Sequence, residues 1–264
     1  MKPKTNVAAK ILGGLSFLIY FFLWAPVIVI IVFSFSGNKY GTSWDGFTLK
    51  WYAELFNNVA VKDALVRSLV VASITVIVST IIGTITGYGL YKLHFRGKQF
   101  LRTSILLPIV FPSVVTGSAL LVFFTRFFQI PLGYPSIIIA HIVFSSPLAV
   151  FVILGRMQRF DWSWEEAAMD LGATRFRTFL RVTGPMLLPA IAASAMLIFP
   201  WSFDDFVITY FVAGIGSTTL PIYVFSQLRF GATPVINTIG TLFVVLTMAA
   251  LALMYFVQKK NESI

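Results

Sequence analysis

Six long apolar stretches limit what this 264-residue chain can fold into. A helix needs about 20 consecutive, mostly apolar residues to cross the hydrocarbon core of a bilayer. Hydrophobic residues make up 58% of the chain and charged residues only 11%, whereas roughly 25% of the residues of a soluble domain are charged. We therefore predict an all-α integral membrane protein with six transmembrane helices. The predicted spans are Ile11–Phe35, Ala64–Leu93, Leu101–Phe124, Pro135–Leu154, Met186–Val212 and Val235–Val257.

The positions of lysine and arginine predict how these spans are oriented. Cytoplasmic loops of membrane proteins collect both residue types. Most of the 20 in this chain lie near the two ends and in the two connections that an N-terminus-inside arrangement places in the cytoplasm. We therefore expect both termini to be cytoplasmic. The same excess of lysine and arginine in cytoplasmic segments explains the formal net charge of +10. We expect no nucleic-acid binding, because the basic residues are dispersed and accompany no nucleic-acid-binding motif.

One cytoplasmic connection, residues 155–185, is the most polar part of the chain. Ser163 followed three residues later by Glu166 has the spacing of a capping box, which predicts the start of a short helix. Gly172 predicts its end, and the apolar residues that follow predict a second helix running into the fifth span. Two roles fit the short helix: presenting its alanines to a groove of a partner protein, or lying on the membrane surface.

The same segment resembles a known motif, and this resemblance favours the partner. The residues concerned are Glu166, Ala167, Ala168 and Gly172. They resemble the EAA motif of the membrane subunits of bacterial binding-protein-dependent ABC importers, and Pro185 is kept beyond them. The motif lies between the fourth and fifth predicted spans, and the general resemblance covers about residues 60–255.

The resemblance implies a fold and a division of the chain. The fold is the six-helix type I ABC importer permease fold. Residues 1–59 would form the first span and a periplasmic loop. Residues 60–255 would form the importer transmembrane domain with its cytoplasmic coupling loop, and residues 256–264 a cytoplasmic tail.

The resemblance also implies partners and a location in the bacterial inner membrane. The motif residues would contact a cleft of an ATPase subunit. Because the chain has no P-loop, ATP and Mg²⁺ are expected in that separate subunit, with no cofactor in this chain and no enzyme activity of its own. The expected partners are a second homologous permease subunit, two copies of the ATPase subunit, a periplasmic substrate-binding protein and membrane lipid.

Two adjacent carboxylates, Asp204 and Asp205, are the only acidic residues within a predicted span. An ionisable residue at membrane depth costs free energy and usually serves a partner or a pathway. Helical spacing places Trp201, both aspartates and Ile208 on one face. A carboxylate beside an indole suits an organic ammonium group through charge and cation–π attraction. Alternatively, these aspartates lie near the outer edge of the span, where they are solvated or cap a break after Pro200, or one of them holds a neighbouring helix, for instance through Arg126 or Arg229.

The surrounding residues resemble one group within the importer family. The segments 202–209 and 216–221, together with Trp51, Tyr52 and the residues that follow them, resemble permease subunits of bacterial spermidine/putrescine importers. This resemblance implies a polyamine as the transported solute, with Trp201, Asp204 and Asp205 along its path. The alternatives are an importer permease for another small solute or an ion-driven secondary transporter, although no internal repeat of the kind common in the latter is visible.

The remaining candidate groups predict no further site. His141 lies within the fourth predicted span, where a lone histidine is expected to make a hydrogen bond between helices. With no cysteine, two separated histidines and few carboxylates, a metal site is not expected. A membrane-embedded enzyme would need convergent catalytic residues inside the spans, and none are present.

Overall fold

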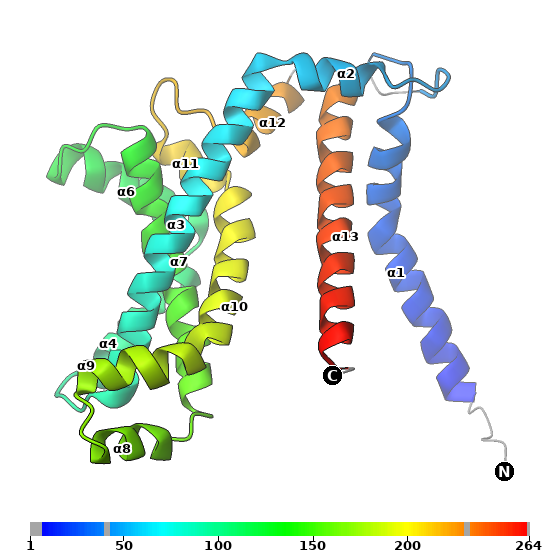
Figure 1. The fold of residues 1–264 in the computed structure, drawn as a ribbon. Helices are drawn as coiled ribbons and strands as arrows, with labels where there is room; N and C mark the ends of the chain where they lie inside the picture. Colours follow the sequence, from blue (N-terminus) through cyan, green and yellow to red (C-terminus); the bar gives the residue numbers. More distant parts are fainter. Residues whose placement is uncertain (1–6, 40–42, 230–232, 263–264) are drawn as a thin grey trace, which may run out of the picture. The chain divides into compact units, whose positions relative to one another are not determined.

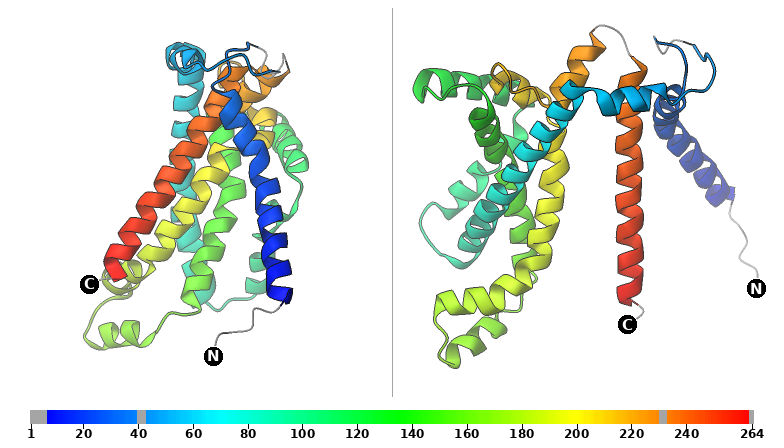
Figure 2. Two further views of the ribbon diagram at one scale, coloured as in Figure 1. Left: turned by 90° about the vertical axis from the view of Figure 1, so that its right-hand side faces the viewer. Right: turned by 45° about the horizontal axis from the view of Figure 1, so that its top comes forward.

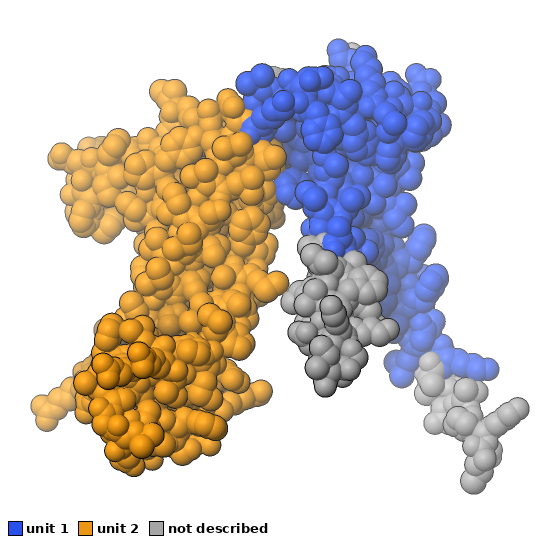
Figure 3. Space-filling view, viewed as in Figure 1, with its two compact units in different colours: residues 1–62, 224–264 blue, residues 63–223 orange. Residues whose placement is uncertain are grey.

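The computed structural model describes residues 7–39, 43–229 and 233–262, with side chains for 10–39, 43–229 and 233–249. These residues form helices and loops, with one isolated antiparallel bridge between Ser36 and Phe47. The prediction of an all-α protein is confirmed for this part of the chain. It forms two compact units, residues 1–62 with 224–264 and residues 63–223 (Figure 3).

The first unit is built on α1 (Val7–Phe33), α2 (Lys50–Asn57) and α13 (Pro234–Glu262). α13 packs against both α1 and α2 (Figures 1 and 2). α2 was not predicted, although Trp51 and Leu55, one helical turn apart, are its two buried residues. The indole of Trp51 donates a 2.7 Å hydrogen bond to the carbonyl of Ser36, which ties α2 to the chain that leaves α1.

The second unit contains three long helices and several short ones (Figure 1). The long helices are α3 (Val59–Lys92), α7 (Tyr134–Met157) and α10 (Gly184–Phe203). α7 packs along α10, and their contact includes the fully buried Ile153, Met157 and Leu187. The short elements are α4 (Lys98–Ser104), α5 (Leu107–Val110), α6 (Ser113–Val122), η1 (Phe123–Phe127), α8 (Ser163–Asp170), α9 (Arg175–Thr178), η2 (Phe179–Thr183) and α11 (Val207–Val212), where η marks a π-helix. A further short helix, α12 (Leu220–Leu228), begins in this unit and ends in the first.

Two glycines let α3 lie very close to α7. A Cβ added at Gly83 would collide with the Cβ of Ala149, and one added at Gly87 would lie 2.8 Å from the Cγ2 of Ile153. Small residues allow such close approach of helices within lipid. Gly89, two residues after Gly87, does not take part, since the nearest atom to its added Cβ is in Leu93 of the same helix.

The third predicted span, Leu101–Phe124, is not one straight helix. The helices on the two sides of Phe111 and Pro112 are bent by 103° relative to one another. Phe111 is extended (ψ 140°), as the residue before a proline prefers to be, and Pro112 cannot donate a backbone hydrogen bond. The local sequence Phe111-Pro112 therefore accounts for the break between the two helices.

The fifth predicted span, Met186–Val212, is corrected at both ends. Helical structure begins earlier, at Arg175, because α9 and η2 lead directly into α10. α10 ends at Phe203, and Asp204 and Asp205 lie in a non-helical break before α11. The prediction that a helix after Gly172 runs into this span is confirmed.

The number of spans remains lower than predicted within the described residues. Four helices there are long and apolar enough to cross a membrane, and the bent pair could add a fifth. The described apolar part of α13, Pro234–Ala249, is shorter than a span. Six spans and two cytoplasmic termini therefore stay predictions. Lys2 and Lys4, on which the orientation partly rests, lie outside the described residues, as do the side chains of Lys259 and Lys260.

Candidate functional site

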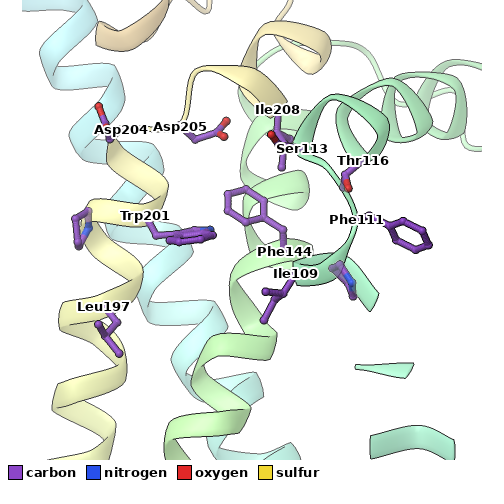
Figure 4. Close-up of a pocket in the computed structure, with 12 residues that line it drawn as sticks. Ile109, Phe111, Ser113, Thr116, Phe144, Leu197, Trp201, Asp204, Asp205 and Ile208 are labelled. Carbon is purple, nitrogen blue, oxygen red and sulfur yellow. The ribbon is translucent and has the colours of Figure 1, made fainter. Parts of the chain in front are cut away.

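A cavity of about 640 Å³ opens beside the break between α10 and α11 (Figure 4). Its walls come from α5, α6, α7, α10 and α11, so it depends on both interrupted predicted spans. Among the described residues that line it, the two aspartates are the only ionisable ones, with no lysine, arginine or histidine. The lining residues are Pro108, Ile109, Phe111, Ser113, Thr116, Phe144, Leu197, Pro200, Trp201, Asp204, Asp205 and Ile208.

Trp201, Asp204, Asp205 and Ile208 all line this cavity, but not for the predicted reason. They do not share one helical face, because the helix ends at Phe203. Trp201 is on the last turn of α10, the aspartates are in the break, and Ile208 is in α11. The indole of Trp201 is half exposed and lies 6.5 Å from the ring of Phe144 on α7, measured between ring centroids.

Asp205 is held by a buried hydrogen-bond network. One of its oxygens, Oδ2, accepts from the backbone N–H of Thr209 at 2.8 Å and from the hydroxyl of Thr209 at 2.9 Å. The same oxygen lies 3.4 Å from Nε2 of His141. The other oxygen, Oδ1, has no hydrogen-bond partner among the described residues. Of the two arginines suggested as partners, Arg126 makes no ion pair with either aspartate, and Arg229 lies in the other unit. The expectation that one aspartate contacts a neighbouring helix is met by Asp205, which contacts α7 through His141.

His141 joins three elements, as a lone buried histidine was expected to do. Its side chain is 1% exposed. Its Nδ1 lies 2.7 Å from the hydroxyl of Ser202 on α10, and its Nε2 lies 2.8 Å from the hydroxyl of Thr209 on α11. A neutral imidazole with its proton on Nε2 satisfies the network, because Ser202 then donates to Nδ1 and Thr209 accepts from Nε2 while donating to Asp205.

Asp204 differs from its neighbour. Its side chain is exposed, and it makes no hydrogen bond or ion pair within the described part of the chain. Figure 4 shows the two carboxylates on different sides of the chain at the break. Asp204 is therefore available to a ligand, whereas one of the two carboxylate oxygens of Asp205 is already bonded within the protein.

The segment with the EAA-like motif forms the short helix α8, but its start is not capped as predicted. Ser163 is the first helical residue, and Trp162 precedes it without a side-chain capping bond. Instead, Asp161 Oδ1 accepts from the backbone N–H of Ser163 at 3.1 Å. Carboxylates near this end still suit the positive pole of the helix dipole.

Gly172 ends the α8 segment, as predicted. Its φ of +85° is left-handed, a conformation that glycine adopts without strain. The N–H of Gly172 donates to the carbonyl of Met169 at 2.9 Å, and the N–H of Ala173 donates to the carbonyl of Ala168 at 3.1 Å. Both bonds satisfy carbonyls that the end of a helix leaves free.

α8 is exposed on one side and anchored on the other. Glu166 and Ala167 are exposed, Ala168 is partly exposed, and the large side chains of Trp164 and Leu171 are 59% and 89% exposed. The residue that anchors α8, Glu165, was not predicted as a site residue. It is buried against α3 and η2, and only tertiary contacts reveal this role.

Comparison with known proteins agrees with this architecture. Residues 79–262 match the family described as "Binding-protein-dependent transport system inner membrane component". The chain is 35% identical to the spermidine/putrescine transport system permease protein PotC of Haemophilus influenzae over 93% of this chain and 95% of that one. It is 40% identical to the putrescine transport system permease protein PotI of Escherichia coli over 84% and 81%.

Solved structures agree on the fold. A chain of a bacterial ABC transporter that imports alginate superposes with a TM-score of 0.73 over 98% of both chains, at 16% sequence identity. The family match covers most of this chain, and the identity to its relatives is high over most of their length, so both comparisons show the family to which the chain belongs. This chain belongs to the family of binding-protein-dependent transport system inner membrane components and is a multi-pass permease subunit of an ABC importer.

Proposed function

We propose that this permease moves polyamines, such as spermidine or putrescine, and that the cavity beside the α10–α11 break is part of their path. The observation that carries the proposal is the charge of the cavity: its two ionisable lining residues are both aspartates. Relatives at 35% and 40% identity are named for the transport of these same cations.

The chemistry of the lining fits such a solute. A polyamine alternates ammonium groups with short methylene segments. Asp204 and the free Oδ1 of Asp205 can accept hydrogen bonds from an ammonium group, and the indole of Trp201 offers a cation–π surface beside them. The methylene segments can lie against apolar lining residues such as Phe144 and Ile208. His141 holds Asp205 in place without lining the cavity itself.

We further propose that the exposed side of α8 docks on an ATPase subunit. Glu166, Ala167, Ala168 and Gly172 would form the contact, with small alanines allowing close insertion. The complete importer would contain a second homologous permease, two ATPase copies that bind ATP and Mg²⁺, and a periplasmic substrate-binding protein. The chain would cross the bacterial inner membrane six times with both termini in the cytoplasm.

The solute proposal is tested by uptake of radiolabelled spermidine and putrescine into proteoliposomes that hold the whole complex. Asp204→Asn keeps the shape of the side chain and removes its charge, so uptake should fall about fivefold or more while assembly stays normal, because an ion pair and a charge-assisted hydrogen bond are lost. Asp63→Asn is the matched control, since Asp63 is exposed on α3 and makes only a 3.9 Å ion pair with Arg67. Equal uptake by the two variants would remove Asp204 from the path.

The docking proposal is tested separately by co-purification. Ala168→Asp places a charge in the proposed contact and should release the ATPase subunit. Gln158→Asp places the same charge on the same cytoplasmic connection outside α8, at an exposed position, and should retain it. Retention of the ATPase by both variants would contradict docking through α8.

A further inference from the structure

The carboxylate of Glu165 is buried on a helix whose other acidic residues are exposed. Its relative exposure is 2%, whereas Glu166 and Asp170 on the same helix are exposed. A buried charge is costly unless it is paired and hydrogen-bonded. The buried side of α8 therefore contains one charged group, Glu165, that needs partners from other elements.

Three side chains from two other elements satisfy Glu165. Nζ of Lys92, at the end of α3, lies 2.5 Å from Oε2. The hydroxyl of Thr183, the last residue of η2, donates to Oε1 at 2.5 Å. The hydroxyl of Tyr88, one turn before Lys92 on α3, lies 3.5 Å from Oε1. Glu165 thus joins α8 to α3 and to the base of α10.

Aromatic rings form a second contact between α3 and the start of α8. Nζ of Lys92 lies 4.2 Å from the centroid of the Trp162 ring, a cation–π distance. Trp162, the residue before α8, stacks on Tyr91 of α3 with ring centroids 5.0 Å apart and planes at 15°. Lys92 is therefore held between a residue that precedes α8 and a residue within it.

The π-helical turn η2 lies where this link meets α10. Residues Phe179–Thr183 form a single wide turn between α9 and α10. Such turns insert one residue into a helix and occur often at functional sites. Here the inserted turn brings the Thr183 hydroxyl to Glu165, and Thr183 itself is fully buried.

We infer that Glu165 is a positioning residue, which with Lys92 and Thr183 transmits movement of α8 to α3 and α10. This inference rests on the proposed docking of α8. The cluster lies on the buried side of α8, away from the exposed residues assigned to docking. Breaking it should leave the ATPase attached but reduce the movement that reaches the transmembrane helices.

The test uses the complete complex in proteoliposomes with the purified binding protein, spermidine and ATP. The variants are Glu165→Gln, which keeps the shape and loses the charge, and Lys92→Met. Spermidine taken up per ATP hydrolysed should fall about tenfold in both, as expected for loss of a hydrogen bond to a charged group, while the ATPase co-purifies at normal levels. Arg96→Met is the matched control. It removes a positive charge at the same end of α3, and Arg96 is exposed with no partner among the described residues.

A double variant separates transmission from stability. Lys92→Met combined with Glu165→Leu leaves no unpaired buried charge, so its assembly should match the wild type, while uptake per ATP should stay as low as in the single variants. Recovery of uptake in the double variant would show that Glu165 only avoids a buried charge, and would overturn the inference. So would uptake per ATP in Glu165→Gln equal to that of the Arg96→Met control.

Failure of the docking proposal gives a different result. If Ala168→Asp retains the ATPase, docking through α8 is wrong whatever the Glu165 variants do. If Ala168→Asp releases the ATPase and Glu165→Gln retains both the ATPase and normal uptake per ATP, only the present inference fails. Loss of the ATPase from Glu165→Gln would assign Glu165 to docking and would also overturn it.

Discussion

Gly83→Ala should destabilise the permease although alanine is the better helix former. Alanine in a helix interior is favoured over glycine by about 1 kcal/mol. At Gly83, however, the added methyl collides with the Cβ of Ala149 and lies 3.0 Å from the backbone carbonyl carbon of that residue. Neither the Cβ nor the backbone of Ala149 can move away by a side-chain rotation. Overpacking of this kind typically costs about 1–3 kcal/mol. The helix preference offsets only part of this cost.

Gly89→Ala is the matched control on the same helix. Its added methyl meets nothing nearer than a side-chain carbon of Leu93 at 4.0 Å, so it keeps the gain in helix preference without the collision. The difference between the two variants should therefore be the full overpacking cost, about 1–3 kcal/mol. This corresponds to a melting temperature lower in Gly83→Ala by about 2–4 °C for each kcal/mol.

The assay is thermal unfolding of the assembled complex in nanodiscs, followed through loss of ATPase activity stimulated by the binding protein. A double variant tests the contact itself: adding Ala149→Gly to Gly83→Ala removes the opposing methyl and should recover most of the lost stability. Equal melting temperatures for Gly83→Ala and Gly89→Ala would refute the close approach of α3 and α7. The close approach would also be refuted if the stability loss of the double variant equalled the sum of the losses of Gly83→Ala and Ala149→Gly.

Three further predictions concern the network, the turn and the exposed helix. His141→Leu leaves the buried hydroxyl of Ser202 without its histidine partner, while Thr209 keeps its bond to Asp205. The complex should therefore lose about 1–3 kcal/mol of stability for the unsatisfied group, measured as a lower melting temperature together with slower spermidine uptake. Gly172→Val forces a β-branched residue into left-handed backbone at a cost of about 1–2 kcal/mol, and the ATPase should co-purify less well with it than with Gly155→Ala, where an added methyl meets nothing. Because the chain has no cysteine, Leu171→Cys can be labelled alone with a membrane-impermeant maleimide. Labelling should occur only in inside-out vesicles and should be blocked by the ATPase, and labelling in intact cells would contradict the proposed orientation.

The sequence by itself determined the class of the protein and the presence of a short helix in its most polar segment. Long apolar stretches predict membrane helices because unpaired backbone groups are too costly in lipid for almost any other structure. The end of α8 at Gly172 was also predictable, because the glycine preference at helix ends is a local property of the backbone. Asp204 and Asp205, which line the cavity from the break between α10 and α11, were identified from their rarity, since carboxylates seldom occur in apolar stretches.

The tertiary structure alone decided how those residues are used. Asp204 and Asp205 are adjacent and chemically identical in the sequence. In the structure, Thr209, four residues on, and His141, about 60 residues away, hold Asp205, whereas the side chain of Asp204 makes no bond within the described part of the chain. Likewise Glu165 and Glu166 differ only in which face of α8 they occupy, and only the ends of α3 and η2 show which face is buried. The physical reason is the same in both cases. Whether a charged side chain is paired or available depends partly on partners that are distant in sequence, such as His141 and Lys92, and local periodicity carries no information about those partners.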